Sequence, residues 1–321
     1  MKRMTAAIVA GVAAAGLAAA ADGGRQAVFR SRMDLVPLGV TVLDRRNTLI
    51  TDLRAEEFEI WEDGRRQEIA YFAPCDAQEA EGAAKPELHL GIMLDVSGSM
   101  DEDLKTARTA AIKFLDAIPG ARDFTVVDFD TEVRAAQFPQ EDFPRLVERL
   151  RGRKAGGYTA LFDAVGVYLD TSSGHQGRKV LVIYSDGSDN SSHITFAETI
   201  DLLKSADVTV YTIGFLEHAG SASFDLRAKL QQMAEVTGGY FINPVSMKEI
   251  ESAYERVRTE IAAQYTLGFV SSNTKTDGAW RKVEIRVVKP GLKDVKIRAR
   301  KGYFAPYRAR GGGPGRLPPA R

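Results

Sequence analysis

The chain has 321 residues, of which 44% are hydrophobic and 27% are charged. This composition is typical of globular proteins and excludes a largely disordered chain, and the length leaves room for two domains of ordinary size. The formal net charge is zero, and we expect no nucleic-acid partner. Lys and Arg nevertheless outnumber Asp and Glu from Tyr265 onwards. Outward-facing strand positions and a solvated tail would explain this excess, and a basic face for an acidic partner is the alternative.

The first 21 residues are typical of an export signal. A basic start at Lys2 and Arg3 precedes an Ala-rich apolar run over Ala6–Leu17, and small residues follow as cleavage sites. The run is shorter than the ~20 strongly apolar residues that span a membrane, which makes an anchor the weaker alternative. We therefore expect an exported protein, periplasmic or extracellular, with no transmembrane segment in the mature chain.

Cys75 is the only cysteine. An internal disulfide and a metal site built from thiolates are therefore excluded. An intermolecular disulfide is the minority alternative.

Residues 22–73 have the pattern of β-strands. We expect strands within Val28–Ser31, Leu35–Asp44 and Leu49–Ile50, followed by Phe58–Gly64, which ends in the hairpin signal Asp-Gly, and a returning strand at Glu68–Phe72. The alternation of apolar and polar residues predicts one buried face and one wet face. So few strands bury too little surface to be stable alone, so this segment needs a partner.

Residues 74–86, rich in Ala, Glu and Asp, form the expected linker, and residues 87–264 then alternate between strand and helix patterns. The expected strands are Leu88–Asp95, Phe124–Phe129, Ala135–Phe138, Lys179–Ser185, Val208–Phe215 and Tyr240–Ile242. The expected helices are Asp103–Ile118, Phe143–Arg151, Ala160–Asp170, Phe196–Ser205, Leu226–Thr237 and Lys248–Gln264, the last with an apolar stripe at Ile250, Tyr254, Val257, Ile261 and Tyr265. Nearly continuous apolar strands predict a doubly wound, mainly parallel six-stranded α/β sheet.

The two-residue period returns over residues 265–307. Strands are expected at Tyr265–Val270, Arg281–Val288 and Val295–Ala299, with Lys301–Pro306 closing the fold. Because two incomplete β segments flank one α/β region, the simplest arrangement pairs residues 22–73 with 265–307. The α/β domain is then inserted in a β-sandwich-like domain. Residues 308–321, rich in Gly and Pro, have the composition of a disordered tail.

The chemistry-bearing residues lie where the first α/β strand ends. Asp95, Ser97 and Ser99 follow a buried apolar run, and a helical pattern begins directly after them. In an open α/β sheet, ligands bind at the carboxyl ends of the strands. A lone Asp-x-Ser-x-Ser is weak evidence, because Ser and Asp are common in turns.

Two further segments complete a pattern. Asp-x-Ser-x-Ser resembles the first part of the metal-ion-dependent adhesion site of von Willebrand factor A domains, which adds a Thr from a Gly-rich loop and an Asp from a Thr-Asp-Gly-like turn. Residues 156–161, Gly-Gly-Tyr-Thr-Ala-Leu, resemble the first of these and residues 184–187, Tyr-Ser-Asp-Gly, the second. The resemblance implies a metal site formed by Asp95, Ser97, Ser99, Thr159 and Asp186. Tyr158 departs from the Gly-Gly-Thr of many relatives, which puts the register of Thr159 in question.

The flanks are also similar to a known group. Val42–Asp44, Phe58–Ile69, the Tyr-x-Leu-Gly-Phe of Tyr265–Phe269 and Arg300–Tyr303 resemble an exported, acidobacterial-type bacterial group related to von Willebrand factor A. With these segments the resemblance covers almost all of the mature chain. The group carries no settled biochemical role.

Two carboxylates and three hydroxyls are hard oxygen ligands. Such a set selects Mg²⁺, with Mn²⁺ or Ca²⁺ as alternatives, over zinc or copper. The resemblance implies that an Asp or Glu of a partner protein completes the metal's coordination. We therefore expect an adhesion-type protein-binding module rather than an enzyme.

Other interpretations stay open. Asp95 could cap the next helix, the serines could be plain turn residues, and Asp186 with Gly187 could form an ordinary turn. Asp163 and Asp189 are either solvated or hydrogen-bond acceptors around the site. A scaffold of the cell envelope with an unused metal site is the main alternative function.

A metal-dependent hydrolase is the less favoured alternative, because no Cys or His occurs in the three site loops and no phosphate loop is present. Of the four histidines, His89 falls on a strand and the others in loops, at His175, His193 and His218. His193 is the one candidate base, with a surface role as its alternative. The sequence does not determine the partner or the oligomeric state.

Overall fold

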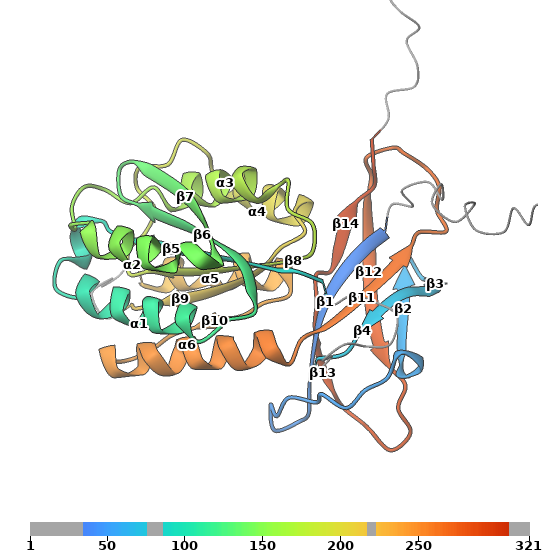
Figure 1. The fold of residues 1–321 in the computed structure, drawn as a ribbon. Coiled ribbons are helices and arrows are strands. Elements are labelled where there is room, and N and C mark those ends of the chain that lie inside the picture. Colours follow the sequence, from blue (N-terminus) through green and yellow to red (C-terminus); the bar gives the residue numbers. More distant parts are fainter. Residues whose placement is uncertain (1–34, 76–85, 217–222, 308–321) are drawn as a thin grey trace, which may run out of the picture. The chain divides into compact units, whose positions relative to one another are not determined.

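The computed structural model describes residues 35–75, 86–216 and 223–307, and these residues form three sheets. The central sheet has six strands in the order β10-β9-β8-β5-β6-β7, and all neighbours are parallel except β6 and β7 (Figure 1). Its strands are β5 (Leu88–Asp95), β6 (Ala121–Phe129), β7 (Val133–Pro139), β8 (Arg178–Ser185), β9 (Thr209–Gly214) and β10 (Phe241–Ile242). The predicted doubly wound, mainly parallel sheet is confirmed.

Helices cover both faces of this sheet. They are α1 (Leu104–Asp116), α2 (Phe143–Gly152), α3 (Leu161–Ser172), α4 (Phe196–Ser205), α5 (Ser223–Thr237) and α6 (Met247–Ala262). Side chains of α1, α2 and α6 pack in one apolar core, and those of α3, α4 and α5 pack in another. Successive strand residues point to opposite faces, so Ile92 joins the first core and Met93 the second. Single-turn 3₁₀ helices occur at Ala55–Glu57, Gly98–Met100 and Gln140–Asp142.

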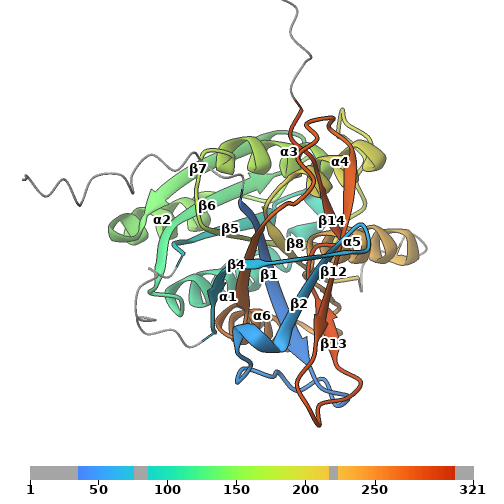
Figure 2. The same ribbon diagram turned by 90° about the vertical axis from the view of Figure 1, so that its right-hand side faces the viewer.

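The flanks pair with each other in two antiparallel sheets (Figure 2). One sheet has the order β13-β1-β11-β4 and the other β14-β12-β2-β3. The N-terminal strands are β1 (Leu35–Leu43), β2 (Phe58–Glu62), β3 (Arg65–Gln67) and β4 (Ile69–Ala73). The C-terminal strands are β11 (Tyr265–Val270), β12 (Trp280–Val287), β13 (Lys296–Arg298) and β14 (Gly302–Phe304). One shared core lies between the sheets, as predicted for a β-sandwich.

Three local predictions are wrong. Glu68–Phe72 is not the hairpin partner of Phe58–Glu62, because β3 takes that place and the chain then crosses to the other sheet as β4. Leu49–Ile50 forms only a bridge from Leu49 to Leu43. The last helix ends at Ala262, so Tyr265 lies outside its apolar stripe and begins β11, as the strand prediction had it. Its hydroxyl accepts from Leu53 N and donates to Ile50 O within the sandwich.

The predicted export signal, the strand at Val28–Ser31, most of the linker and the C-terminal tail lie outside the described residues. Among the residues that are described, no helix combines the length and apolar character needed to span a membrane.

Candidate functional site

The predicted site residues gather at the carboxyl edge of the central sheet. Asp95 is the last residue of β5, and Asp186 follows directly after β8. These strands are parallel neighbours, with Leu94 in register with Tyr184. Strands that run side by side in one direction bring their ends together. Residues far apart in sequence therefore lie at one place.

Asp95 is fully buried, and hydrogen bonds hold both of its oxygens. The backbone N–H of Ser97 donates to Oδ1 at 2.9 Å, and the Ser185 hydroxyl donates to Oδ2 at 2.6 Å. Burial, together with the nearby Asp186 carboxylate, raises the pKa of Asp95 to about 7 against the lowering effect of the hydrogen bonds from Ser185 and Ser97. A cation at this position would favour the ionised carboxylate.

Hydroxyl groups connect the two acids. Ser97 Oγ lies 3.1 Å from Ser99 Oγ, and Ser99 Oγ donates to Asp186 Oδ1 at 2.9 Å. Asp95, Ser97 and Asp186 are buried, whereas Ser99 is exposed. The two acids and Ser97 are therefore shielded from solvent, and the cluster is open to solvent at Ser99.

Thr159 joins the cluster from the loop before α3. A Cβ atom on Gly187 would lie 3.2 Å from Thr159 Oγ1 and 3.5 Å from Ser99 Oγ, so both hydroxyls border the same space. The backbone N–H of Thr159 donates to Asn190 Oδ1 at 2.8 Å, and the N–H groups of Asn190 and Ser191 donate to its carbonyl oxygen. Tyr158 does not displace Thr159 from this position, because its exposed side chain lies outside the cluster.

The Gly-rich loop is fixed against the Asp95 loop by backbone hydrogen bonds. Gly156 N donates to Val96 O at 2.9 Å, and Gly98 N donates to Gly157 O at 3.1 Å. Gly157 has a φ of +77°, and a Cβ there would lie only 2.7 Å from Thr131 Oγ1. Both facts require glycine at this position.

Asp163 and Asp189 are hydrogen-bonded acceptors rather than solvated groups. Asp163 accepts from the backbone N–H groups of His193 and Ile194, and Asp189 accepts from Phe162 N at 3.0 Å. These bonds lower the pKa of Asp163 although burial opposes them. The two acids fix the loop after β8 against the start of α3.

His193 is a surface residue. Its side chain is 94% exposed, and its Nδ1 lies 2.8 Å from Asp163 Oδ2. Asp163 thus fixes the His193 ring at the surface.

The sequence interpretation missed Ser185. Its hydroxyl orients Asp95, and it also lies 3.2 Å from the carbonyl oxygen of Gly187. The only available signal was its place beside Asp186, at the end of an apolar strand.

Solved structures similar to this chain include the vWF domain of the type V pili tip protein Mfa5 from Porphyromonas gingivalis, at 12% identity and a TM-score of 0.47, covering 56% of this chain and 96% of that one. A von Willebrand factor type A protein from Catenulispora acidiphila has 13% identity and a TM-score of 0.48, and the match covers 88% of this chain and 76% of that one. The PilB minor pilin from Streptococcus sanguinis has 10% identity and a TM-score of 0.47, and the match covers 70% of this chain and 87% of that one. The comparison with curated proteins gave no match.

A family model, the von Willebrand factor type A domain, matches residues 89–256. The match covers more than half of the chain and includes the whole central sheet apart from Leu88. It also contains Asp95, Ser97, Ser99, Thr159 and Asp186. The chain therefore belongs to the von Willebrand factor type A domain family.

Proposed function

We propose that the cluster binds Mg²⁺ and that the bound ion receives a carboxylate from a partner protein. The ligands would be Asp95, Ser97, Ser99, Thr159 and Asp186. The observation that carries this proposal is the convergence of two buried carboxylates and three hydroxyls from three separate loops at one edge of the sheet.

The donor set fits a hard divalent cation. All five side chains offer oxygen, which suits Mg²⁺, and Mn²⁺ or Ca²⁺ are the alternatives. The Asp186 charge raises the pKa of the buried Asp95 carboxyl, and a divalent cation between the two acids would remove this repulsion. The repulsion between the two acids therefore favours a bound cation, because the hydrogen bonds of the cluster do not cancel this repulsion.

The open side of the cluster suits an acidic ligand. Mg²⁺ retains several waters when few carboxylates hold it, and only two are present in this set. With both acids ionised, the two carboxylates balance the charge of the ion, and a partner carboxylate would replace one of these waters as a further hard oxygen ligand. Ser99 and Tyr158, which is 67% exposed, would border the approaching partner. An exposed aromatic beside a charged anchor is a frequent centre of protein–protein contacts.

We infer that this module acts outside the cytoplasm, since the first 21 residues have the pattern of an export signal. The proposal assigns no catalytic role. A scaffold that does not use the metal is the competing function.

The test is a selection from a random peptide library displayed on phage against the mature protein, with Mg²⁺ or with EDTA. We expect peptides enriched in Asp or Glu that bind only with Mg²⁺ and that bind neither Asp95→Ala nor Thr159→Ala protein. Enriched peptides that bind equally with EDTA and to both variants would refute the proposal and favour the scaffold.

A further inference from the structure

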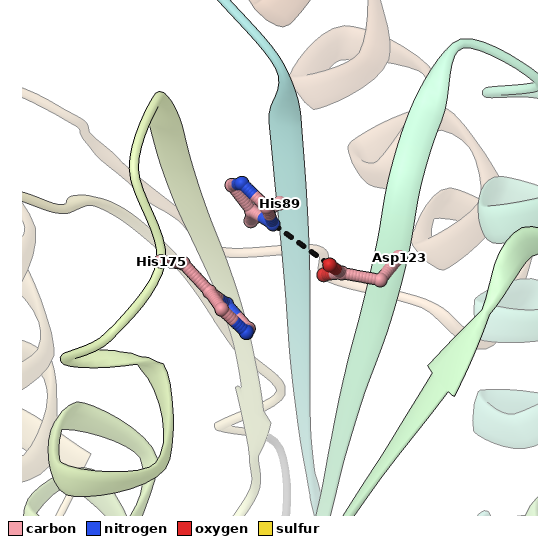
Figure 3. A group of neighbouring side chains, drawn as sticks. All are labelled: His89, Asp123 and His175. Atoms are coloured by element: carbon pink, nitrogen blue, oxygen red, sulfur yellow. Dashed lines mark hydrogen bonds and ion pairs between the residues drawn. The ribbon is translucent and has the colours of Figure 1, made fainter.

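A second group of metal-ligating side chains lies at the opposite end of the central sheet. It consists of His89 on β5, Asp123 on β6 and His175 in the loop before β8, and the three side chains face one another (Figure 3). One ligand atom from each lies within 4.8 Å of those of the other two. His89 is six residues before Asp95 on the same strand, which is about 20 Å at the rise of a β-strand. The two sites are therefore separate.

The contacts of His89 require a proton or a metal ion between its ring and Asp123. Its Nε2 lies 2.8 Å from the carbonyl oxygen of Gln176, which can only accept a hydrogen bond, so Nε2 carries a proton. Its Nδ1 lies 2.9 Å from Asp123 Oδ2, which is also an acceptor when ionised. A ring proton, a carboxyl proton or a metal ion must therefore lie between these two atoms.

The rest of the group favours the metal ion. The His175 ring stacks on the His89 ring with centroids 4.5 Å apart, so both imidazoles lie at one place. Gln137 contacts His175 Nε2, whereas the buried Nδ1 has no hydrogen-bond partner among the described residues. Asp123 Oδ1 is likewise buried without a partner there. A buried nitrogen of His175 and a buried oxygen of Asp123 thus each have unused hydrogen-bonding or ligating capacity among the described residues.

The geometry points to a Zn²⁺ site formed by His89, Asp123 and His175. Two imidazoles and one carboxylate are a donor set for zinc, which binds nitrogen at about 2.0–2.1 Å and oxygen at about 2.0–2.2 Å, and magnesium disfavours such a set. Closing the ligands around one ion requires the His175 ring to turn out of its stack on His89, because a metal binds an imidazole nitrogen in the plane of the ring and the two planes are only 21° apart. The Gln176 carbonyl already holds the His89 ring in the way that outer partners hold zinc-ligating histidines.

A bound ion would join three elements. His89 and Asp123 are register partners on adjacent strands, and His175 belongs to the loop between α3 and β8. Lys179 Nζ donates to the His175 carbonyl oxygen at 2.9 Å and fixes the start of this loop. The ion would therefore stabilise the end of the sheet that is remote from the proposed magnesium site.

The test is zinc binding by the mature protein in competition with a chromophoric chelator, with excess Mg²⁺ present. Because zinc also accepts carboxylate oxygens, each measurement is repeated in the Asp95→Ala background. We expect one zinc per chain in both backgrounds, and at least a 100-fold loss of affinity in His175→Ala. His193→Ala is the matched control, since His193 also pairs with an Asp but belongs to no metal-ligating group among the described residues, and zinc binding should not change.

Two further measurements complete the test. Co²⁺ should give the intense visible bands of tetrahedral coordination, and Asp123→Asn should remove them although an amide can still contact His89. Zinc should raise Tm in the Asp95→Ala protein but not in its His175→Ala derivative. Loss of zinc binding in Asp95→Ala, or zinc binding that persists in both His175→Ala and Asp123→Asn, would overturn the proposal. The group would then be a structural His–Asp ion pair.

Discussion

Replacing Ser185 by Ala should weaken Mg²⁺ binding without removing any of the proposed ligands. The Ser185 hydroxyl donates to Asp95 Oδ2 at 2.6 Å inside a fully buried environment. A hydrogen bond to a charged group contributes about 1.5–3 kcal/mol. At about 1.4 kcal/mol per tenfold change, the loss corresponds to about 10- to 100-fold weaker binding, which is the range seen for outer partners of metal ligands.

Calorimetric titration of Mg²⁺ measures this effect, and the loop offers a matched control. Ser188 lies three residues further on, and its hydroxyl is buried with no hydrogen-bond partner among the described residues. Ser188→Ala should leave the affinity unchanged. Equal affinity of Ser185→Ala and wild type, with both folded by circular dichroism, would refute the assignment of Ser185 as the group that positions Asp95.

Three other changes test a buried ion-pair cluster, a buried carboxyl group and the proposed contact surface. Asp128 is buried on β6 and pairs with Arg134, Arg149 and Arg153. Asp128→Asn should therefore lower the free energy of unfolding, measured by urea denaturation, by about 3–5 kcal/mol. A loss below about 1 kcal/mol would contradict this prediction. Burial raises the pKa of Glu260 from 4.5 to about 7, although Arg298 opposes it. The protonated Glu260 side chain therefore stabilises the folded protein fully below pH 4.5. This contribution to the free energy of unfolding, about 3 kcal/mol, is lost as the pH rises towards 7. Glu260→Gln should remove this part of the pH dependence of the free energy of unfolding. Stability–pH curves of the variant and wild type that run parallel would contradict the role given to Glu260. Tyr158→Ala should change stability by less than about 0.5 kcal/mol yet weaken binding of selected acidic peptides, and undiminished binding would exclude Tyr158 from the contact surface.

Much of the fold could be predicted from hydrophobic periodicity. The strands Leu88–Asp95 and Lys179–Ser185 are apolar on both faces, and this pattern alone predicts a covered parallel sheet. The crossing at Glu68 could not be predicted, because the same alternation fits a strand in either sheet of the sandwich. Tyr265 fitted the helical stripe by spacing, but the helix ends at Ala262 and the aromatic ring packs with Phe58 instead.

The candidate site could be predicted in part. Asp95, Ser97 and Ser99 form a local motif, and the family resemblance located Thr159 and Asp186. Ser185 was not predicted, because its role depends on the pairing of β8 with β5 rather than on its sequence neighbours. His89, Asp123 and His175 belong to no motif and come together only through the fold.

Calorimetric titration of Mg²⁺ into the mature protein, beside Asp95→Ala, tests the central proposal most directly. Asp201→Ala is the control, because Asp201 is a surface residue of α4 that pairs only with Lys204 among the recorded ion pairs of the described residues. Saturable binding of one Mg²⁺ per chain by wild type and Asp201→Ala, lost in Asp95→Ala, is the predicted result. Identical titrations for all three folded proteins would contradict the proposed magnesium site.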